Sequence, residues 1–246
     1  MVVYGWMLIR TRPPHSRRCL LSPCPELPIP YYDKDGITIY HGDCREILPQ
    51  LPKVDLVLTD PPYGVGIDYG EAQPADLPDH IEWLAESCLP IFRSAARVVA
   101  ITPGIVNLSK WRGADWCLAW TWKHTGTTGK WGFNQWGPIL VWGTDPMLSA
   151  GKGRHPDVVR CSGDEPLPAG HPCPKPIRAW KKILSRLSLD SQTILDPFMG
   201  SGTTLVAAKQ LGRKSIGIEI EEKYCDIAIE RLAQGVLPLT KEEVPA

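Results

Sequence analysis

The chain has 246 residues and a mass of 27.3 kDa, the size of one domain with a sizeable core. Basic and acidic residues number 27 each, so net charge gives no general attraction to nucleic acid or membrane, and a polyanionic partner must be met by a local basic patch. No apolar run approaches the roughly 18 residues of a membrane span, and the opening residues lack the order of a signal peptide, which predicts a cytoplasmic protein.

The first 30 residues are rich in proline and arginine and contain no acid before Glu26. We expect residues 1–30 to be a flexible extension, or an artefact of a start codon assigned upstream of the true one. Residues 31–246 are expected to form one domain. The eight cysteines include no CxxC pair, which argues against a zinc site and a disulfide framework. Cys161, His171 and Cys173 come nearest to a metal cluster, but loop and packing roles are favoured and no metal is expected.

The first half of the chain predicts strands and one long helix. Residues 36–43 alternate and are rich in β-branched side chains, which predicts a strand, and the apolar run 54–59 is typical of a strand buried on both faces of a parallel sheet. A helix kinked by Pro90 is expected over 79–96, followed by a buried strand in "RVVAITPG". Strand, helix and strand in this order predict a parallel pair with a right-handed crossover.

Tryptophan is concentrated in the middle of the chain, where seven of the ten tryptophans lie between residues 111 and 142. "CLAWTW" and "PILVWG" predict two strands joined by a glycine-rich loop. Because these tryptophans flank the expected strands, most are assigned to the core. From Asp145 to Gly170 the sequence predicts only a polar connection without helix or strand.

The last third alternates helices and strands: helix 176–188, strand 193–198, helix 203–212, strand 215–220 and helix 221–235. Such alternation predicts an α/β sandwich with a mostly parallel, doubly wound sheet and helices on both faces.

A glycine turn, "MGSG", lies between an expected strand and helix, where open α/β sheets bind ligands. Gly200 and Gly202 would let a ligand approach the backbone and the amides at the helix start. The absence of a GK[ST] sequence disfavours a nucleotide triphosphate. Glu219 ends the next strand, where an acid accepts hydrogen bonds from both ribose hydroxyls. NAD remains possible, but S-adenosylmethionine fits better, since its amino acid end can contact the amides and Asp196. The alternative for Asp196 is a capping or turn residue.

The stretch "LVLTDPPYG" ends a buried strand with an acid, two prolines and an aromatic ring. Asp60 should lie at the carboxyl edge of the sheet, beside the glycine turn if the two strands are neighbours. Pro61 and Pro62 hold a rigid extended path that leaves carbonyls free to accept, and Tyr63 offers a flat ring. Together these groups form a receptor for a planar group with an amine, such as a nucleobase. The alternative is a proline turn with Tyr63 packed in the core.

These motifs together resemble the exocyclic-amino DNA methyltransferases of the beta class. "TDPPYG" is similar to the catalytic motif of that family, "LDPFMGSGTT" to its cofactor motif, "IGIEI" to its acidic ribose motif and "HPCPKP" to its HPxxKP segment. "YHGDCREIL" resembles the start of the family's domain. The catalytic motif precedes the cofactor motif, the permuted order that defines the class. The resemblance implies a Rossmann-like S-adenosylmethionine methyltransferase.

The resemblance also implies residue roles. The flipped base would stack on Tyr63 and present its amine to Asp60 and the Pro61 carbonyl, without a covalent enzyme intermediate. Asp43 and Cys44 resemble the contact to the cofactor adenine, and four further residues resemble contributors to the methionine end or the pocket wall: Phe198, Ser201, Thr203 and Lys175. A surface lysine is the alternative for Lys175. An aspartate opening the tetrapeptide is associated with adenine N6 in this family, and a serine with cytosine N4, so adenine is predicted.

For DNA contact we expect a small recognition region around residues 111–170, whose loop interleaves basic and aromatic residues with glycine. The candidate contacts are Lys123, His124, Lys130 and Trp131. The family normally has a longer insertion here, so recognition would be relaxed or would come from a homodimer or the 64–80 loop. The alternatives are cytosine N4 methylation, RNA or protein-glutamine methylation, and a catalytically idle binding module.

Overall fold

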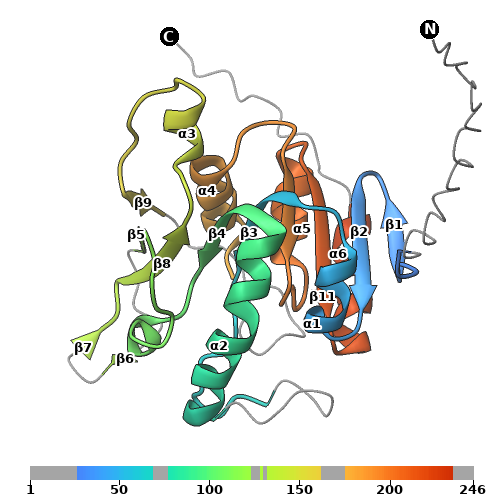
Figure 1. The fold of residues 1–246 in the computed structure, drawn as a ribbon, viewed down its shortest axis with the longest axis horizontal. Helices are drawn as coiled ribbons and strands as arrows, with labels where there is room; N and C mark the ends of the chain where they lie inside the picture. Colours follow the sequence, from blue (N-terminus) through green and yellow to red (C-terminus); the bar gives the residue numbers. More distant parts are fainter. Residues whose placement is uncertain (1–26, 69–76, 123–127, 130–131, 162–174, 235–246) are drawn as a thin grey trace, which may run out of the picture.

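One mixed sheet organises the computed structural model, which describes residues 27–68, 77–122, 128–129, 132–161 and 175–234 (Figure 1). Within these residues the sheet has nine strands, in the spatial order β1 (Tyr32–Lys34), β2 (Ile37–His41), β11 (Lys214–Glu219), β10 (Thr193–Asp196), β3 (Val54–Thr59), β4 (Ala96–Ile101), β8 (Trp136–Trp142), β5 (Trp116–Thr121) and β9 (Val158–Arg160). A separate two-stranded ribbon pairs β6 (Thr128–Gly129) with β7 (Gly132–Phe133).

The centre of the sheet is parallel, as the buried apolar runs predict. β2, β11, β10, β3 and β4 run in one direction, while β8 is antiparallel to both β4 and β5. In the middle, Ile194 of β10 pairs with Leu56 of β3. The mostly parallel α/β sheet predicted from the sequence is therefore confirmed.

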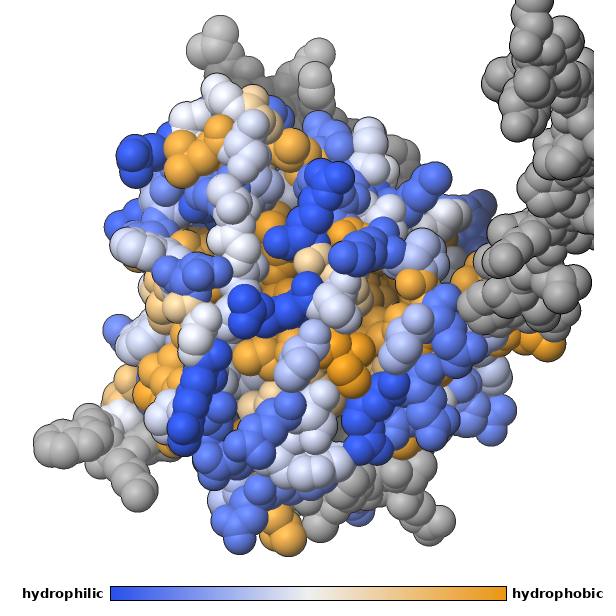
Figure 2. Space-filling model, in the orientation of Figure 1, coloured by the Kyte–Doolittle hydropathy of each residue, from blue (hydrophilic) through white to orange (hydrophobic). Residues whose placement is uncertain are grey.

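Helices cover both faces of this sheet (Figure 1). On one face α1 (Cys44–Ile47), the short 3-10 turn η1 (Leu48–Gln50) and α2 (Pro78–Ala95) pack on the sheet, with Phe92 against Val57 in one core cluster. On the other face lie α4 (Ile177–Leu187), α5 (Thr203–Gln210) and α6 (Glu222–Ala233). Side chains alternate between the two cores along each strand, so Leu56 joins the cluster of α4 and α5. On the face seen in Figure 2, hydrophobic surface lies scattered among hydrophilic side chains.

Helix α2 is continuous from Pro78 to Ala95 and contains Pro90. Proline has no amide hydrogen to donate to the carbonyl of Glu86, so a local kink at this point remains a prediction.

The region from Asp145 to Gly170 corrects the expectation of a connection without regular elements. It contains α3 (Pro146–Ser149) and β9, which pairs in parallel with β5. The Asp145 side chain caps α3 by accepting from the Met147 amide at 2.8 Å, and it pairs with Arg186 of α4 at 2.7 Å. Three residues of strand and one turn of helix are too short to give a periodic signal, so tertiary pairing decides both.

The tryptophans are divided between core and surface. Trp111, Trp142 and Trp180 are buried, whereas Trp116 is 62% exposed and Trp136 is 40% exposed. The assignment of most of the tryptophan-rich segment to the core therefore holds for part of it, and Trp131 lies outside the described residues. In the described part of the chain, no helix combines the length and apolar character needed to cross a membrane.

Candidate active site

Four neighbouring strands bring their carboxyl ends, and the residues that follow them, to one edge of the sheet. In spatial order these are β11, ending at Glu219; β10, ending at Asp196; β3, followed by Asp60; and β4, followed by Thr102. The Thr59 hydroxyl donates to Asp196 Oδ1 at 2.7 Å, and the Thr102 amide donates to the Thr59 carbonyl at 3.1 Å. The segment 60–63 and the glycine turn thus follow adjacent strands. This is the arrangement that the sequence analysis gave as the condition for Asp60 to lie beside the turn.

The Asp60 carboxylate is held from several sides. Its Oδ1 atom accepts hydrogen bonds from the hydroxyls of Tyr63 and Thr102, and its Oδ2 atom forms an ion pair with the ammonium group of Lys175. The side chains of Asp60 and Lys175 are 19% and 12% exposed, so the pair is partly shielded from water. Because three donors converge on it, the carboxylate has a fixed position at the open edge of the sheet.

The Tyr63 ring is half-buried, which excludes the alternative of a ring sealed in the core. The Lys175 ammonium lies 5.0 Å from the ring centroid, a cation–π distance. Gly104 lies next to the ring, since an added Cβ there would be 3.5–3.8 Å from three of its carbons. Pro61 is buried and Pro62 half-buried, which fixes the corner between Asp60 and the ring.

The glycine turn is held tightly between β11 and α6. Gly200 and Gly202 have positive φ angles of 50° and 76°, in the left-handed region that favours glycine. A Cβ on Gly202 would lie 2.7 Å from the Cβ of Ala228 in α6. The Gly202 amide donates to the Met199 carbonyl at 2.8 Å, which closes the turn before α5 begins.

The carboxylate of Glu219 faces this turn. It is 4% exposed and accepts from the amides of Gly200 at 2.9 Å and Glu221 at 3.0 Å. Burial raises the pKa of Glu219, while the backbone hydrogen bonds oppose that rise. A buried carboxylate beside a glycine turn, at a strand end, suits a ligand with hydroxyl donors, so these residues fit the ribose of a nucleoside cofactor.

Asp196 has the surroundings of a turn residue, the alternative weighed from its position in the sequence. It is 4% exposed and accepts from the Thr59 hydroxyl at 2.7 Å, the Phe198 amide at 3.1 Å and the Thr204 hydroxyl. Burial raises the pKa of Asp196 to about 6, although these hydrogen bonds lower it. In this structure the buried Asp196 carboxylate therefore stabilises the turn through its hydrogen bonds with Phe198 and Thr204.

The turn also contacts Arg231, a residue that sequence reasoning missed. The guanidinium group of Arg231 in α6 donates to Ser201 Oγ at 2.9 Å and to Thr203 Oγ1 at 3.2 Å. Ser201 and Thr203 are 3% and 7% exposed. Arg231 follows Ala228 by three residues, so both lie on the helix face toward the turn. That spacing is the only signal in the sequence that could have indicated the contact.

The remaining candidates lie around these groups. The Asp43 carboxylate caps α1 by accepting from the Arg45 amide at 2.8 Å, and the Gly42 amide donates to the Glu219 carbonyl at 2.9 Å, which places Asp43 near the end of β11. Cys44 is buried, and the hydrogen bond that its thiol shares with Cys88, together with burial, raises its pKa. The Phe198 ring packs edge-to-face on Phe92.

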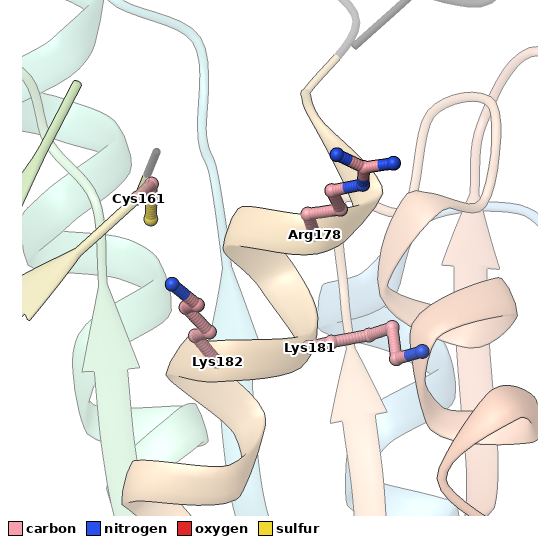
Figure 3. Close-up of a pocket in the computed structure, with 4 residues that line it drawn as sticks. All are labelled: Cys161, Arg178, Lys181 and Lys182. Carbon is pink, nitrogen blue, oxygen red and sulfur yellow. The ribbon is translucent and has the colours of Figure 1, made fainter. Parts of the chain in front are cut away.

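The four predicted DNA contacts, Lys123, His124, Lys130 and Trp131, lie outside the described residues, as do His171 and Cys173. A local concentration of positive charge does occur at the start of α4. Arg178, Lys181 and Lys182 line a hollow of about 310 Å³ together with Cys161 (Figure 3). Lys182 extends toward Cys161 and donates to the Arg160 carbonyl at 2.7 Å (Figure 3).

Comparison with known proteins bears on what this edge does. A family model described as DNA methylase, of the N6 and N4 type, matches residues 109–230. The Escherichia coli (strain K12) protein YubD, named as a candidate methylase, is 32% identical over 217 residues, which cover 78% of this chain and 88% of that protein. The chain belongs to the N6/N4 DNA methylase family.

A further relative and two solved structures match most of the chain. The type II methyltransferase M.ScaI of Streptomyces caespitosus is 27% identical over 82% of this chain and 83% of its own length. The crystal structure of the M1.HpyAVI complex with S-adenosylmethionine superposes with a TM-score of 0.58, at 25% identity, over 80% of this chain and 99% of that one. The PvuII cytosine-N4-specific DNA methyltransferase shares the fold with a TM-score of 0.62, at 17% identity, over 86% and 90%.

The predicted family, the Rossmann-like fold and the cofactor are thereby confirmed. The chain is a DNA methyltransferase of the exocyclic-amine type that uses S-adenosylmethionine as methyl donor.

Proposed function

We propose that this methyltransferase modifies the N6 amine of adenine in duplex DNA, and that Asp60, Pro61, Pro62 and Tyr63 receive the flipped base. The observation that carries the proposal is the position of the Asp60 carboxylate beside the half-buried Tyr63 ring, at the strand end next to the glycine turn. A base that stacks on the ring brings its exocyclic amine to the carboxylate.

An exocyclic amine is a weak nucleophile because its lone pair is delocalised into the base. Hydrogen bonds from its two N–H groups to Asp60 and to the Pro61 carbonyl favour the pyramidal nitrogen and stabilise the charge that develops on it. Thr102 and Tyr63 hold the carboxylate in place through their hydroxyls. Lys175, paired with Asp60 and 5.0 Å from the Tyr63 ring centroid, would line the receptor on the side that faces the cofactor.

The cofactor fits the neighbouring turn. S-adenosylmethionine supplies an electrophilic methyl group when it is bound. Glu219, which accepts from the Gly200 amide, would also accept hydrogen bonds from the ribose hydroxyls, and Asp43 and Cys44 would line the adenine side. The turn residues Gly200, Ser201, Gly202 and Thr203, with Phe198, would line the methionine end, and Asp196 holds that turn through its hydrogen bonds.

Adenine is preferred to cytosine because an aspartate opens the catalytic tetrapeptide. Both amines use the same acceptors, so the preference is an association within the family. We further propose that DNA is contacted by Lys123, His124, Lys130 and Trp131, in a recognition region around residues 111–170 of a single domain that spans 31–246. A homodimer would extend this small region.

The deciding experiment incubates the protein and tritiated S-adenosylmethionine with unmethylated duplex DNA, with RNA and with protein, followed by nucleoside analysis of whatever is labelled. We expect label in DNA as N6-methyladenine, and its loss in the Asp60→Ala variant, which should still bind the cofactor. Label in N4-methylcytosine would replace adenine by cytosine, and label only in RNA or protein would refute the proposal.

A further inference from the structure

Two exposed aliphatic side chains lie on the short turn that follows Gly104, the glycine next to the Tyr63 ring. This turn, η2 (Ile105–Asn107), follows β4 after Thr102, Pro103 and Gly104. Val106 is 73% exposed and Ile105 is 39% exposed. Adjacent large aliphatic side chains in water forgo the stabilisation that burial would give them, and an apolar surface beside a functional site often marks a contact with a partner.

The turn is rigidly attached to the proposed base receptor. The buried side chain of Asn107 donates to the Tyr63 carbonyl at 2.8 Å and to the Pro103 carbonyl at 3.1 Å. Gly104 has a φ of +71° and lies directly against the Tyr63 ring. The hydrogen bonds of Asn107 therefore hold the aliphatic pair beside the Tyr63 backbone.

We propose that Val106, with Ile105 beside it, is an apolar wedge that enters the base stack of duplex DNA next to the base received by Tyr63. The inference rests on the proposed function, since its partner is the duplex from which that base is extruded. A base on Tyr63 stays joined to its strand through the sugar-phosphate backbone, so the duplex that it leaves would lie over the same edge of the sheet as η2.

The chemistry of the two side chains suits this partner. Extruding a base exposes the flat, apolar faces of its neighbours to water, and proteins that unstack DNA insert aliphatic or aromatic side chains between such faces. Val106 and Ile105 are β-branched and nearly fixed at χ1, so little side-chain entropy is lost when they insert. A polar side chain would have to give up hydrogen bonds with water in the same place.

The test compares methylation of a matched duplex with that of a duplex carrying a mismatch opposite the target base, in the recognition site identified by sequencing methylated DNA. A mismatch lowers the energy needed for extrusion, so a wedge matters less. We expect Val106→Ala to lower kcat/KM on the matched duplex by about tenfold relative to the wild type. On the mismatched duplex the same variant should lose much less of its kcat/KM. Val106→Leu, which keeps an apolar side chain, should stay near wild type.

The matched control is Ile29→Ala, since Ile29 is 93% exposed and precedes β1, the edge strand that four other strands separate from β4. We expect this control to methylate both duplexes as the wild type does. An equal loss of Val106→Ala on matched and mismatched DNA would indicate a structural role, and no loss on either would show that the pair does not contact the stack; both results overturn the wedge. If the wild type labels no DNA, it is the proposed function that fails instead.

Discussion

The Thr59 hydroxyl donates a hydrogen bond of 2.7 Å to the Asp196 carboxylate. Thr59 is the last residue of β3, directly before Asp60, and Asp196 is the last residue of β10, before the glycine turn. Thr59 is fully buried and Asp196 is 4% exposed, so little water competes for this bond. It joins the corner proposed to receive the base to the turn proposed to hold the cofactor.

Replacing Thr59 by valine should therefore weaken both stability and alignment. The change keeps the shape of the side chain but leaves a buried carboxylate oxygen with one donor fewer, and such a loss lowers the free energy of unfolding by about 1–3 kcal/mol. Chemical denaturation measures this directly. Thr59→Ser keeps the hydroxyl and serves as the control, and equal stability of the serine and valine variants would contradict the prediction.

Asp196 gives the protein a specific dependence of stability on pH. Burial raises the pKa of this carboxyl from its ordinary value of 3.8 to about 6 in the folded state. At pH 5 the folded state therefore holds a proton that the unfolded state has released, so the contribution is full below pH 4 and is lost as the pH rises through 6. The shift corresponds to about 3 kcal/mol.

The Asp196→Asn variant separates this effect from the titration of other groups, because asparagine has no proton to release. We expect the free energy of unfolding of the wild type, minus that of Asp196→Asn, to fall between pH 4 and pH 7 by about 3 kcal/mol. Denaturant titrations at several pH values measure the difference. A difference that rises with pH would mean that the folded-state pKa lies below 3.8.

The site was predictable from the sequence where it depends on strand ends. Asp60, Gly200 and Glu219 each follow or end an apolar run, and the carboxyl ends of parallel strands share one edge. Thr102 and Arg231 were not predictable, because a threonine after a strand and an arginine on a helix are common. Their contacts with Asp60 and with the glycine turn arise only when β4 and α6 pack.

The same distinction applies to the fold. The long apolar strands β3 and β4 and the periodic helix α4 were found because each carries its own pattern over several residues. β9 has three residues and is fixed by its pairing with β5, and α3 is fixed by the Asp145 cap and the ion pair with Arg186. Local pattern cannot reveal elements whose stability comes from tertiary contacts.

The two parts of Tyr63 should contribute unequally to activity. The ring provides the stacking surface, which is worth about 1–3 kcal/mol per base, whereas the hydroxyl adds one of three donors to Asp60. Tyr63→Ala should lower kcat/KM for DNA by about 10- to 100-fold, and Tyr63→Phe by only a few-fold. Steady-state methylation assays, with cofactor binding measured separately, test this. A phenylalanine variant as impaired as the alanine variant would assign the main role to the hydroxyl.

Gly202 should tolerate no side chain, for two separable reasons. Its φ of +76° strains any other residue, and a Cβ would lie 2.7 Å from the Cβ of Ala228, so α6 would have to move from the turn that holds Ser201 and Thr203. Gly212 provides a matched control, because its φ is +66° and an added Cβ meets no atom within 4 Å. Gly212→Ala should cost about 1 kcal/mol of stability from backbone strain alone.

We expect Gly202→Ala to be more destabilising than Gly212→Ala and to raise the KM for S-adenosylmethionine, which the control should leave unchanged. Adding Ala228→Gly removes the opposing Cβ, so the double variant should recover the part of the loss caused by the clash and keep the part caused by the φ angle. Thermal unfolding and cofactor titration of the wild type and these three variants measure both parts. If Ala228→Gly restores nothing, the backbone angle alone determines the requirement for glycine, and the packing of α6 against the turn does not position the cofactor site.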